Sequence, residues 1–241
     1  MLSRTCEPPA DDPKLEAKVY REMDHGDVNR RFVTDLFRSG PVGPRVIDLG
    51  CGPALIPILL CEHAEQITCD DVESDDHSEL VVMGVDNCAE MLELARFEIE
   101  FAGRLRQIQL QRIDLSDDES LDAELADTVI CNTVLHHLDD PAAALRLAIR
   151  ALQPAGRLFI RDLVRPETET EVERLVALHG GAVEENASGV SPSQLLRQSF
   201  YASLTLAEIR GLVSDLGIDA DCVNMTSDRH WTLDCRRPER S

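Results

Sequence analysis

The chain has 241 residues, a formal charge of −21 and an apolar fraction of 43%. Its length suits one domain of ordinary size with a sizeable core. The acidic excess disfavours nucleic acid as a substrate, because a phosphate backbone repels such a chain unless its arginines cluster. The sequence has no uninterrupted run of about 18 apolar residues, so no membrane span is predicted. It also lacks an apolar stretch near the N-terminus, so no secretory signal is predicted.

The eight cysteines are scattered along the chain and form no CxxC pair. The sequence therefore predicts no zinc site, and no other metal site is expected. Several cysteines fall inside predicted strands and helices, where they serve as small apolar residues. A reduced protein in the cytoplasm is the expected setting.

The N-terminal part divides into a tail and the start of a domain. Residues 1–13 combine prolines with acidic residues and are expected to form a disordered tail. A single domain is expected over residues 14–241. It begins with apolar residues at helical spacing over 14–38, which predict an N-terminal helix.

Apolar strand patterns then alternate with amphipathic helix patterns. This alternation predicts βαβ units and a doubly wound, mostly parallel sheet. The strands are almost continuously apolar, as strands covered on both faces must be. The acidic segment 69–79 is expected to be a solvated surface loop. The predicted strands are 46–49, 80–86, 108–113, 127–132 and 158–163, and the predicted helices are 55–64, 89–102 and 141–152.

The last third has a different pattern, with helices before strands. Helices are predicted at 168–179, 192–201 and 205–217, and two closing strands at 222–225 and 231–235. Thr205 and Glu208 have the spacing of a capping box at the start of the third of these helices. The helical segment at about 166–203 is expected to form a small lid.

The first motif is the run VIDLGCGP over residues 46–53. A strand leads into a turn in which Gly50 and Gly52 lack a Cβ, so a ligand can lie against the backbone. The helix that follows offers free N–H groups and a positive dipole end. Asp48, at the end of the strand, could meet a ligand ammonium. A dinucleotide-binding turn needs a third small residue where this chain has Leu55, which argues against NAD or FAD.

The runs DLGCGP and GVDNCAEML resemble the first two motifs of class I S-adenosylmethionine-dependent methyltransferases. That family has a seven-stranded, mostly parallel sheet whose last strand is antiparallel. The resemblance extends from about residue 45 to 162 and more weakly beyond. It implies S-adenosylmethionine as the cofactor and a binding role for Asp48, Gly50, Cys51 and Gly52. It also implies that Asp86 accepts hydrogen bonds from the ribose hydroxyls, with Asn87 beside the adenine.

Two later segments complete the predicted cofactor site. Asp114 and Leu115 follow the third strand, where the carboxylate could accept the adenine amino group and the Leu115 N–H could meet the ring. The alternative is an aspartate in a turn followed by a buried leucine. The run CNTVLHHLDDP resembles the segment after the fourth strand in the small-molecule branch of the family. Asn132 would then lie beside the methionine moiety of the cofactor.

The catalytic candidates are His136, His137 and Tyr201. Neighbouring histidines on a helical turn point in different directions, so one is expected to pack or cap and the other to face the acceptor as a base. Tyr201 is a candidate because it lies in the expected lid.

The sequence thus predicts an enzyme that transfers a methyl group from S-adenosylmethionine to an unidentified, small-molecule acceptor. An RNA or protein methyltransferase is an alternative, although the (N/D)PP(Y/F) motif of many amino-group methylases is missing. A non-catalytic, S-adenosylmethionine-binding regulatory protein is a second alternative, and an NAD-dependent oxidoreductase is a third. The oligomeric state does not follow from the sequence.

Overall fold

The computed structural model describes residues 2–8, 26–70, 79–180 and 191–237. The beginning of the predicted N-terminal helix and most of the acidic loop lie outside the described residues. Within them, each predicted strand is found, with ends that shift by a few residues.

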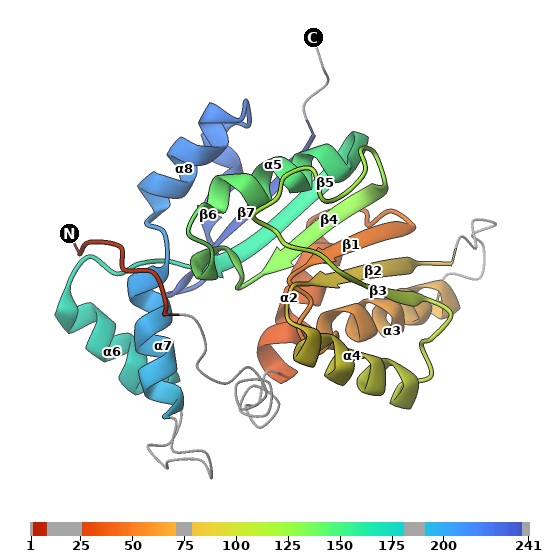
Figure 1. Ribbon diagram of the computed structural model, residues 1–241, viewed down its shortest axis with the longest axis horizontal. Coiled ribbons are helices and arrows are strands. Elements are labelled where there is room, and N and C mark those ends of the chain that lie inside the picture. Colours follow the sequence, from red (N-terminus) through yellow and green to blue (C-terminus); the bar gives the residue numbers. More distant parts are fainter. Residues whose placement is uncertain (1, 9–25, 71–78, 181–190, 238–241) are drawn as a thin grey trace.

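A seven-stranded sheet forms the centre of the molecule, with the strand order β3-β2-β1-β4-β5-β7-β6 (Figure 1). Neighbouring strands from β3 to β5 are parallel, whereas β7 is antiparallel to both β5 and β6. This confirms the predicted doubly wound α/β sheet with its antiparallel last strand. The strands are β1 (Arg45–Leu49), β2 (Val81–Asp86), β3 (Ile108–Arg112), β4 (Ala126–Asn132), β5 (Leu152–Leu163), β6 (Val223–Met225) and β7 (His230–Arg236).

Helices cover both faces of the sheet (Figure 1). One face packs against α2 (Gly26–Ser39), α3 (Leu55–Asp70) and α4 (Ala89–Phe101), and the other against α5 (Pro141–Ala151) and α8 (Leu206–Asp215). Successive side chains of a strand point to opposite faces of the sheet, so each strand packs against the helices on both faces. In β1, for example, Val46 belongs to the first apolar cluster and Ile47 to the second. Both clusters are buried, which explains the continuous apolar runs of the sequence.

The boundary between α5 and β5 differs from the prediction. The helix ends at Ala151 and the strand begins at once, well before the predicted start at residue 158. The pairing with β4 shifts register between Ala126 and Thr128, and Ala155 has a φ of +59°. An irregular, bulged strand start of this kind is not visible in the apolar pattern, because the residues after Leu152, at 153–157, form no apolar run.

The start of α8, in the last third of the chain, has the cap that the sequence predicts. The side chain of Thr205 accepts a hydrogen bond from the N–H of Glu208, and the Glu208 side chain accepts one from the N–H of Thr205. The predicted capping box of α8 is therefore confirmed. The short helices η1 (Leu135–His137) and η2 (Ala220–Cys222) lie between the larger elements.

The segment for which the sequence predicts a lid contains α6 (Glu169–His179) and α7 (Pro192–Ala202). The two helices form a third, smaller apolar cluster with Leu163 at the end of β5. Figure 1 shows them beside the sheet rather than over either of its faces. They are therefore anchored at the carboxyl end of the central strands.

Residues 2–8 form an extended segment along α7 (Figure 1). Thr5 donates its N–H to the carbonyl of Tyr201 at 3.0 Å, and the Arg4 guanidinium donates to the carbonyls of Ala202 and Leu138 at 2.7 and 2.6 Å. The sequence predicts disorder for residues 1–13, but this part of the tail is tied down by carbonyls at helix ends. Such long-range contacts leave no local pattern in the sequence.

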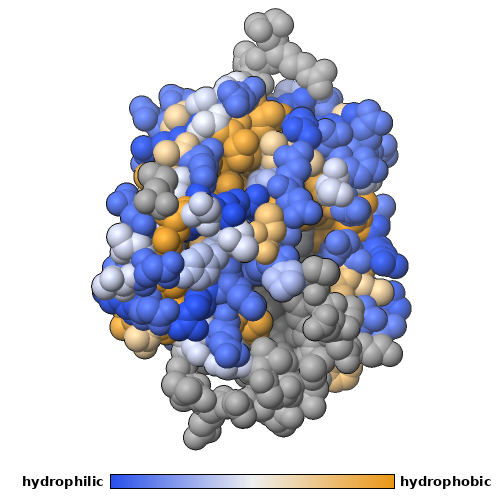
Figure 2. Space-filling view, turned by 60° about the vertical axis from the view of Figure 1, so that its left-hand side comes forward, coloured by the Kyte–Doolittle hydropathy of each residue, from blue (hydrophilic) through white to orange (hydrophobic). Residues whose placement is uncertain are grey.

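The face of the molecule drawn in Figure 2 is mainly polar. On the face shown in Figure 2, hydrophilic residues separate small patches of hydrophobic ones. Among the described helices, none combines the length and the apolar character needed to cross a membrane.

Candidate functional site

The turn after β1 brings the backbone into an unusual conformation. Gly50, Gly52 and Ala54 have φ angles of +72°, +51° and +60°. The N–H groups of Gly50 and Cys51 both donate to the carbonyl of Val85, which ties the turn to β2. A Cβ at Gly50 would lie 2.5 Å from a methyl group of Val134, whereas a Cβ at Gly52 would meet nothing within 4 Å. Gly50 is therefore required by packing, and Gly52 leaves open space beside the turn.

A small cleft, partly open to solvent, lies at this turn. It occupies the carboxyl ends of β1 and β4 and the N-terminus of α3, where free N–H groups favour anionic or polar ligand atoms. Its lining residues are Asn29, Asp48, Gly50, Cys51, Pro53, Leu55, Ile56 and Asn132. The structure thus brings Asp48, Gly50 and Cys51 of the first motif together with Asn132 of the fourth, and Gly52 belongs to the same turn without lining the cleft.

Asn29 in α2 was not predicted as a site residue. It is buried, and it lies on the same helix face as Phe32, Val33 and Leu36. A polar residue on an otherwise apolar helix face was the signal available in the sequence, because such a group is buried only when something polar faces it.

One carboxyl group, that of Asp48, lines the cleft, and a second, that of Asp86, is hydrogen-bonded to the turn beside it. Asp48 is 2% exposed, and burial together with the charge of Asp86 raises its pKa well above the ordinary value. Asp86 accepts hydrogen bonds from the N–H groups of Gly52 at 3.0 Å and Cys88 at 2.8 Å. Burial raises the pKa of Asp86, and these hydrogen bonds oppose the rise. A cation in the cleft would favour the ionised form of Asp48.

Asn132 adds an amide to the cleft wall. Among the described residues its Oδ1 is buried without a hydrogen-bond partner, while its Nδ2 contacts the hydroxyl of Thr133. A buried acceptor that lacks a donor costs free energy. The amide oxygen is therefore available to a donor on a ligand.

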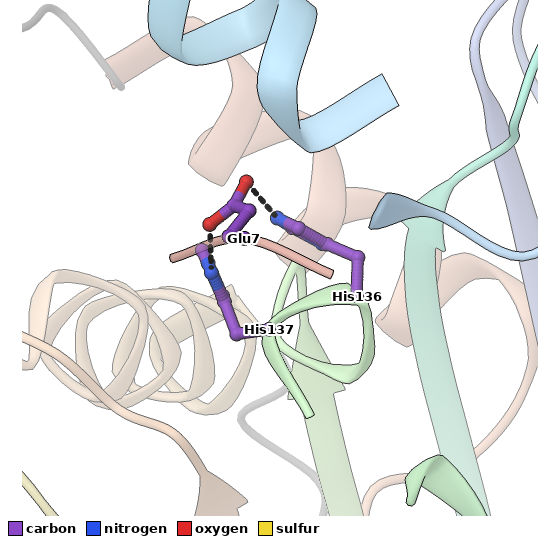
Figure 3. A group of neighbouring side chains, drawn as sticks. All are labelled: Glu7, His136 and His137. Atoms are coloured by element: carbon purple, nitrogen blue, oxygen red, sulfur yellow. Dashed lines mark hydrogen bonds and ion pairs between the residues drawn. The ribbon is translucent and has the colours of Figure 1, made fainter. Parts of the chain in front are cut away.

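A second polar group follows Asn132 along the chain. His136 and His137 are the last two residues of η1, and their ring centroids lie 4.0 Å apart. The sequence predicted that they point in different directions, which is wrong, because both rings turn toward Glu7 (Figure 3). The expectation that one of them packs fits His136, which is buried against Asp162, whereas the side chain of His137 is exposed. The Nδ1 atom of His137 lies 2.6 Å from Glu7 Oε2, and the Nε2 atom of His136 lies 3.9 Å from Glu7 Oε1.

Comparisons with known proteins agree with this geometry. A family model described as "Methyltransferase domain" matches residues 42–205. The chain belongs to this methyltransferase family. The curated ubiquinone biosynthesis O-methyltransferase of Idiomarina loihiensis is 28% identical over 180 residues, which cover 73% of this chain and 67% of that protein. The protein of the same name from Alkalilimnicola ehrlichii is 27% identical over 209 residues, covering 83% and 75%.

Solved structures show the same fold. A SAM dependent methyltransferase from Aquifex aeolicus superposes with a TM-score of 0.63 at 17% identity, covering 95% of this chain and 100% of that one. A putative S-adenosyl-L-methionine-dependent methyltransferase from Methanococcus maripaludis gives a TM-score of 0.66 at 16% identity, covering 98% and 99%. The chain is thus a class I methyltransferase, and its cofactor is S-adenosylmethionine.

Other predicted residues of the methyltransferase lie outside the cleft lining. Asn87 is exposed at the end of β2, where its carbonyl accepts from the guanidinium of Arg112 at 2.9 Å. Asp114 accepts hydrogen bonds from the N–H and the hydroxyl of Ser116 at 2.9 and 2.8 Å. Leu115 is buried in the core. The aspartate in a turn and the buried leucine that the sequence left as an alternative are both present.

Tyr201 does not approach the cleft lining through any contact of the described residues. Its hydroxyl donates to Glu169 of α6, and this hydrogen bond to a carboxylate raises the pKa of the phenol. A tyrosine held in this way keeps its proton. The side chain links α7 to α6, which is a structural role for a residue predicted as catalytic.

Proposed function

We propose that the methyltransferase holds S-adenosylmethionine in the cleft at β1 and β4 and transfers its methyl group to an oxygen atom of a small molecule. The observation that carries the proposal is the pairing of Asp86 with the turn at Gly52, next to open space. The curated relatives named ubiquinone biosynthesis O-methyltransferase favour oxygen as the atom that is methylated.

The adenosyl part of the cofactor would lie between the turn and the end of β2. Asp86 would exchange its hydrogen bond from Gly52 for hydrogen bonds from the ribose hydroxyls, which a carboxylate accepts strongly. Asn87, Asp114 and the N–H of Leu115 would meet the adenine. The free space beside Gly52 would hold the ligand against the backbone, with Cys51 below it.

The methionine end would lie deeper in the cleft. Its ammonium would face Asp48, whose raised pKa marks a carboxyl group that gains from a nearby cation. The amides of Asn29 and Asn132 would supply the remaining hydrogen bonds. The unpaired Oδ1 of Asn132 would then gain a donor, which offsets the cost of burying it.

The methyl transfer itself needs little beyond alignment of the acceptor with the methyl group, because a methyl group on a sulfonium is already activated. Holding the acceptor in line can lower the barrier by roughly 7–11 kcal/mol at best. An oxygen acceptor must also lose a proton. The histidines His136 and His137 follow closely after Asn132 along the chain, and together with Glu7 they are the proposed place for this step. Equal, wild-type turnover in His136→Ala and His137→Ala would remove histidine from the reaction.

The charge of the chain favours a small-molecule acceptor, as do the names of its relatives. With 45 acidic and 24 basic residues, the chain repels a phosphate backbone, which disfavours RNA. The buried free thiols of Cys51, Cys61 and Cys131 fit the reducing cytoplasm expected from the sequence. We propose α6 and α7 as the elements that border the acceptor.

Methyl transfer from a labelled cofactor tests the proposal. The protein is incubated with labelled S-adenosylmethionine and, in separate arms, catechols, simple phenols, aromatic amines and thiols. We expect label in the hydroxylated compounds and none in the amines. Transfer to amines or thiols alone would contradict the proposed acceptor, and a control with heat-treated protein measures the uncatalysed reaction.

A further inference from the structure

Three potential metal ligands converge although they are far apart in the sequence. Glu7 belongs to the N-terminal segment, while His136 and His137 belong to η1. Each residue offers one ligand atom, and these atoms all lie within 4.8 Å of one another. Figure 3 shows the carboxylate between the two imidazole rings.

The ring of His136 is held in an orientation that suits a metal ligand. Its Nδ1 atom lies 2.6 Å from Oδ1 of Asp162, and the other carboxylate oxygen accepts the N–H of His136 at 3.0 Å. Asp162 is 1% exposed and also accepts the N–H of Leu163. A carboxylate on Nδ1 leaves the lone pair of a neutral ring on Nε2, the atom that faces Glu7. This carboxylate–histidine arrangement is the usual support of a metal-binding histidine.

Glu7 is held in place by its own segment. Arg4 and Thr5 tie that segment to the end of α7 and to η1, and the hydroxyl of Ser199 donates to Glu7 Oε1 at 2.6 Å. A carboxylate has about four lone-pair positions, so it can bind an ion while it keeps this hydrogen bond.

We propose that Glu7, His136 and His137 bind a divalent transition-metal ion of the zinc type. Two imidazole nitrogens and one carboxylate oxygen suit such an ion, and three protein ligands leave a further position open. Tetrahedral ligands at about 2.0–2.1 Å from zinc lie roughly 3.4 Å from one another. Small side-chain movements bring the three ligand atoms to this spacing.

A metal site at these residues differs from the expectation from the sequence, which predicts none. Zinc motifs are recognised by short spacings within one stretch of chain, whereas Glu7 is contributed from a distant segment. The ion would lie on the loop after Asn132, beside the cleft. There it would lower the pKa of a coordinated acceptor hydroxyl, a role that rests on the proposed methyl transfer to oxygen.

Metal titration of the full chain tests the site directly. The protein is stripped with a chelator and titrated with Zn²⁺ by calorimetry, and with Co²⁺ by visible absorption. We expect one saturable equivalent and a cobalt spectrum of low coordination number. Glu7→Gln and His137→Gln should each weaken zinc binding at least tenfold, and Asp162→Asn by about 10–100-fold.

His179→Gln is the matched control. His179 also pairs with a carboxylate, Asp228, at 2.8 Å, but it lies on α6 away from the cluster. Its loss should leave zinc affinity unchanged. Because Asp162 is buried, thermal unfolding without metal shows whether each variant folds, and Glu7→Gln carries the test if Asp162→Asn does not.

The opposite pattern would overturn the site. An absence of saturable binding does so, as does binding that survives in Glu7→Gln and His137→Gln. Zinc binding is measured without an acceptor, so its outcome is separate from that of the proposed function. Intact methyl transfer in a protein that binds no zinc would contradict only the metal site, whereas zinc binding without transfer to hydroxyl groups would contradict only the proposed acceptor.

Discussion

Two glycines of the turn after β1 differ in what a side chain would meet. In Gly50→Ala the new Cβ would lie 2.5 Å from Val134, and the φ of +72° is strained for alanine. In Gly52→Ala the Cβ would enter open space, and only the strain of φ +51° remains, at about 1–2 kcal/mol. We expect Gly52→Ala to lose more cofactor affinity than stability, and Gly50→Ala to lose both.

Chemical unfolding and cofactor titration of the two variants check this difference. If S-adenosylhomocysteine binds Gly52→Ala as tightly as wild type, the cofactor does not lie against that part of the turn. The ligand would then occupy another position in the cleft.

His230 links the stability of the protein to pH. Burial, together with the charges of Arg229 and Arg161, lowers its pKa from 6.5 to about 3. An unfolded chain binds this proton below about pH 6.5 and the folded chain does not. The stabilising contribution is therefore complete above pH 6.5 and is lost progressively as the pH falls toward 3.

The expected slope is up to roughly 1.4 kcal/mol for each pH unit below 6.5. Urea unfolding between pH 7 and 5 measures it in wild type and in His230→Gln, which cannot take up the proton. The variant should lose this part of the pH dependence. Parallel curves for the two proteins would show that His230 does not titrate as described.

At the level of elements, one buried arginine joins three parts of the fold. Arg157 of β5 forms a double hydrogen bond with Asp234 of β7 at 2.9 and 2.8 Å. It also donates to the carbonyls of Leu36 and Gly40 at the end of α2, at 2.9 and 2.8 Å. Cations stabilise the C-terminal end of a helix. Arg157 therefore fixes α2, and with it Asn29, against the sheet.

Replacing this arginine should be costly. We expect Arg157→Met to lower the free energy of unfolding by about 3 kcal/mol, because Asp234 and the carbonyls lose their partner. The matched control is Arg30→Met, which removes an exposed pair with Asp27 and should leave the urea midpoint unchanged. Equal effects in the two variants would contradict a special role for Arg157.

The elements themselves could be predicted because the parallel strands are apolar runs bounded by turns. The same logic placed Asp48, Gly50 and Asp86 at one edge of the sheet, where the structure has them. Asn29 and Glu7 could not be found in this way, since each approaches the site through tertiary contacts between distant segments. The direction of His136 and His137 failed for a related reason: η1 is a single tight turn whose rings are set by Glu7 and Asp162.

At the scale of the whole molecule, the formal charge of −21 opposes compaction. Surface charges of one sign repel each other over roughly 10 Å at about 0.1 M salt, and less as salt is added. We expect the melting temperature to rise by a few degrees when NaCl is increased from about 0.02 to 0.5 M. Scanning fluorimetry in NaCl tests this. Chloride is chosen over sulfate because sulfate stabilises folded proteins by being excluded from their surface, whatever their charge. A melting temperature that falls with NaCl would mean that attractive ion pairs dominate.

The central claim is that the cofactor binds at the carboxyl ends of β1 and β2, with its ribose on Asp86. Calorimetric titration with S-adenosylhomocysteine measures it, with Asp86→Ala as the test and Asp122→Ala, an exposed loop residue, as the control. We predict saturable binding that Asp86→Ala weakens by about 1–3 kcal/mol and Asp122→Ala leaves unchanged. Absence of binding to the wild-type chain, or equal affinity in a folded Asp86→Ala variant, would contradict the claim.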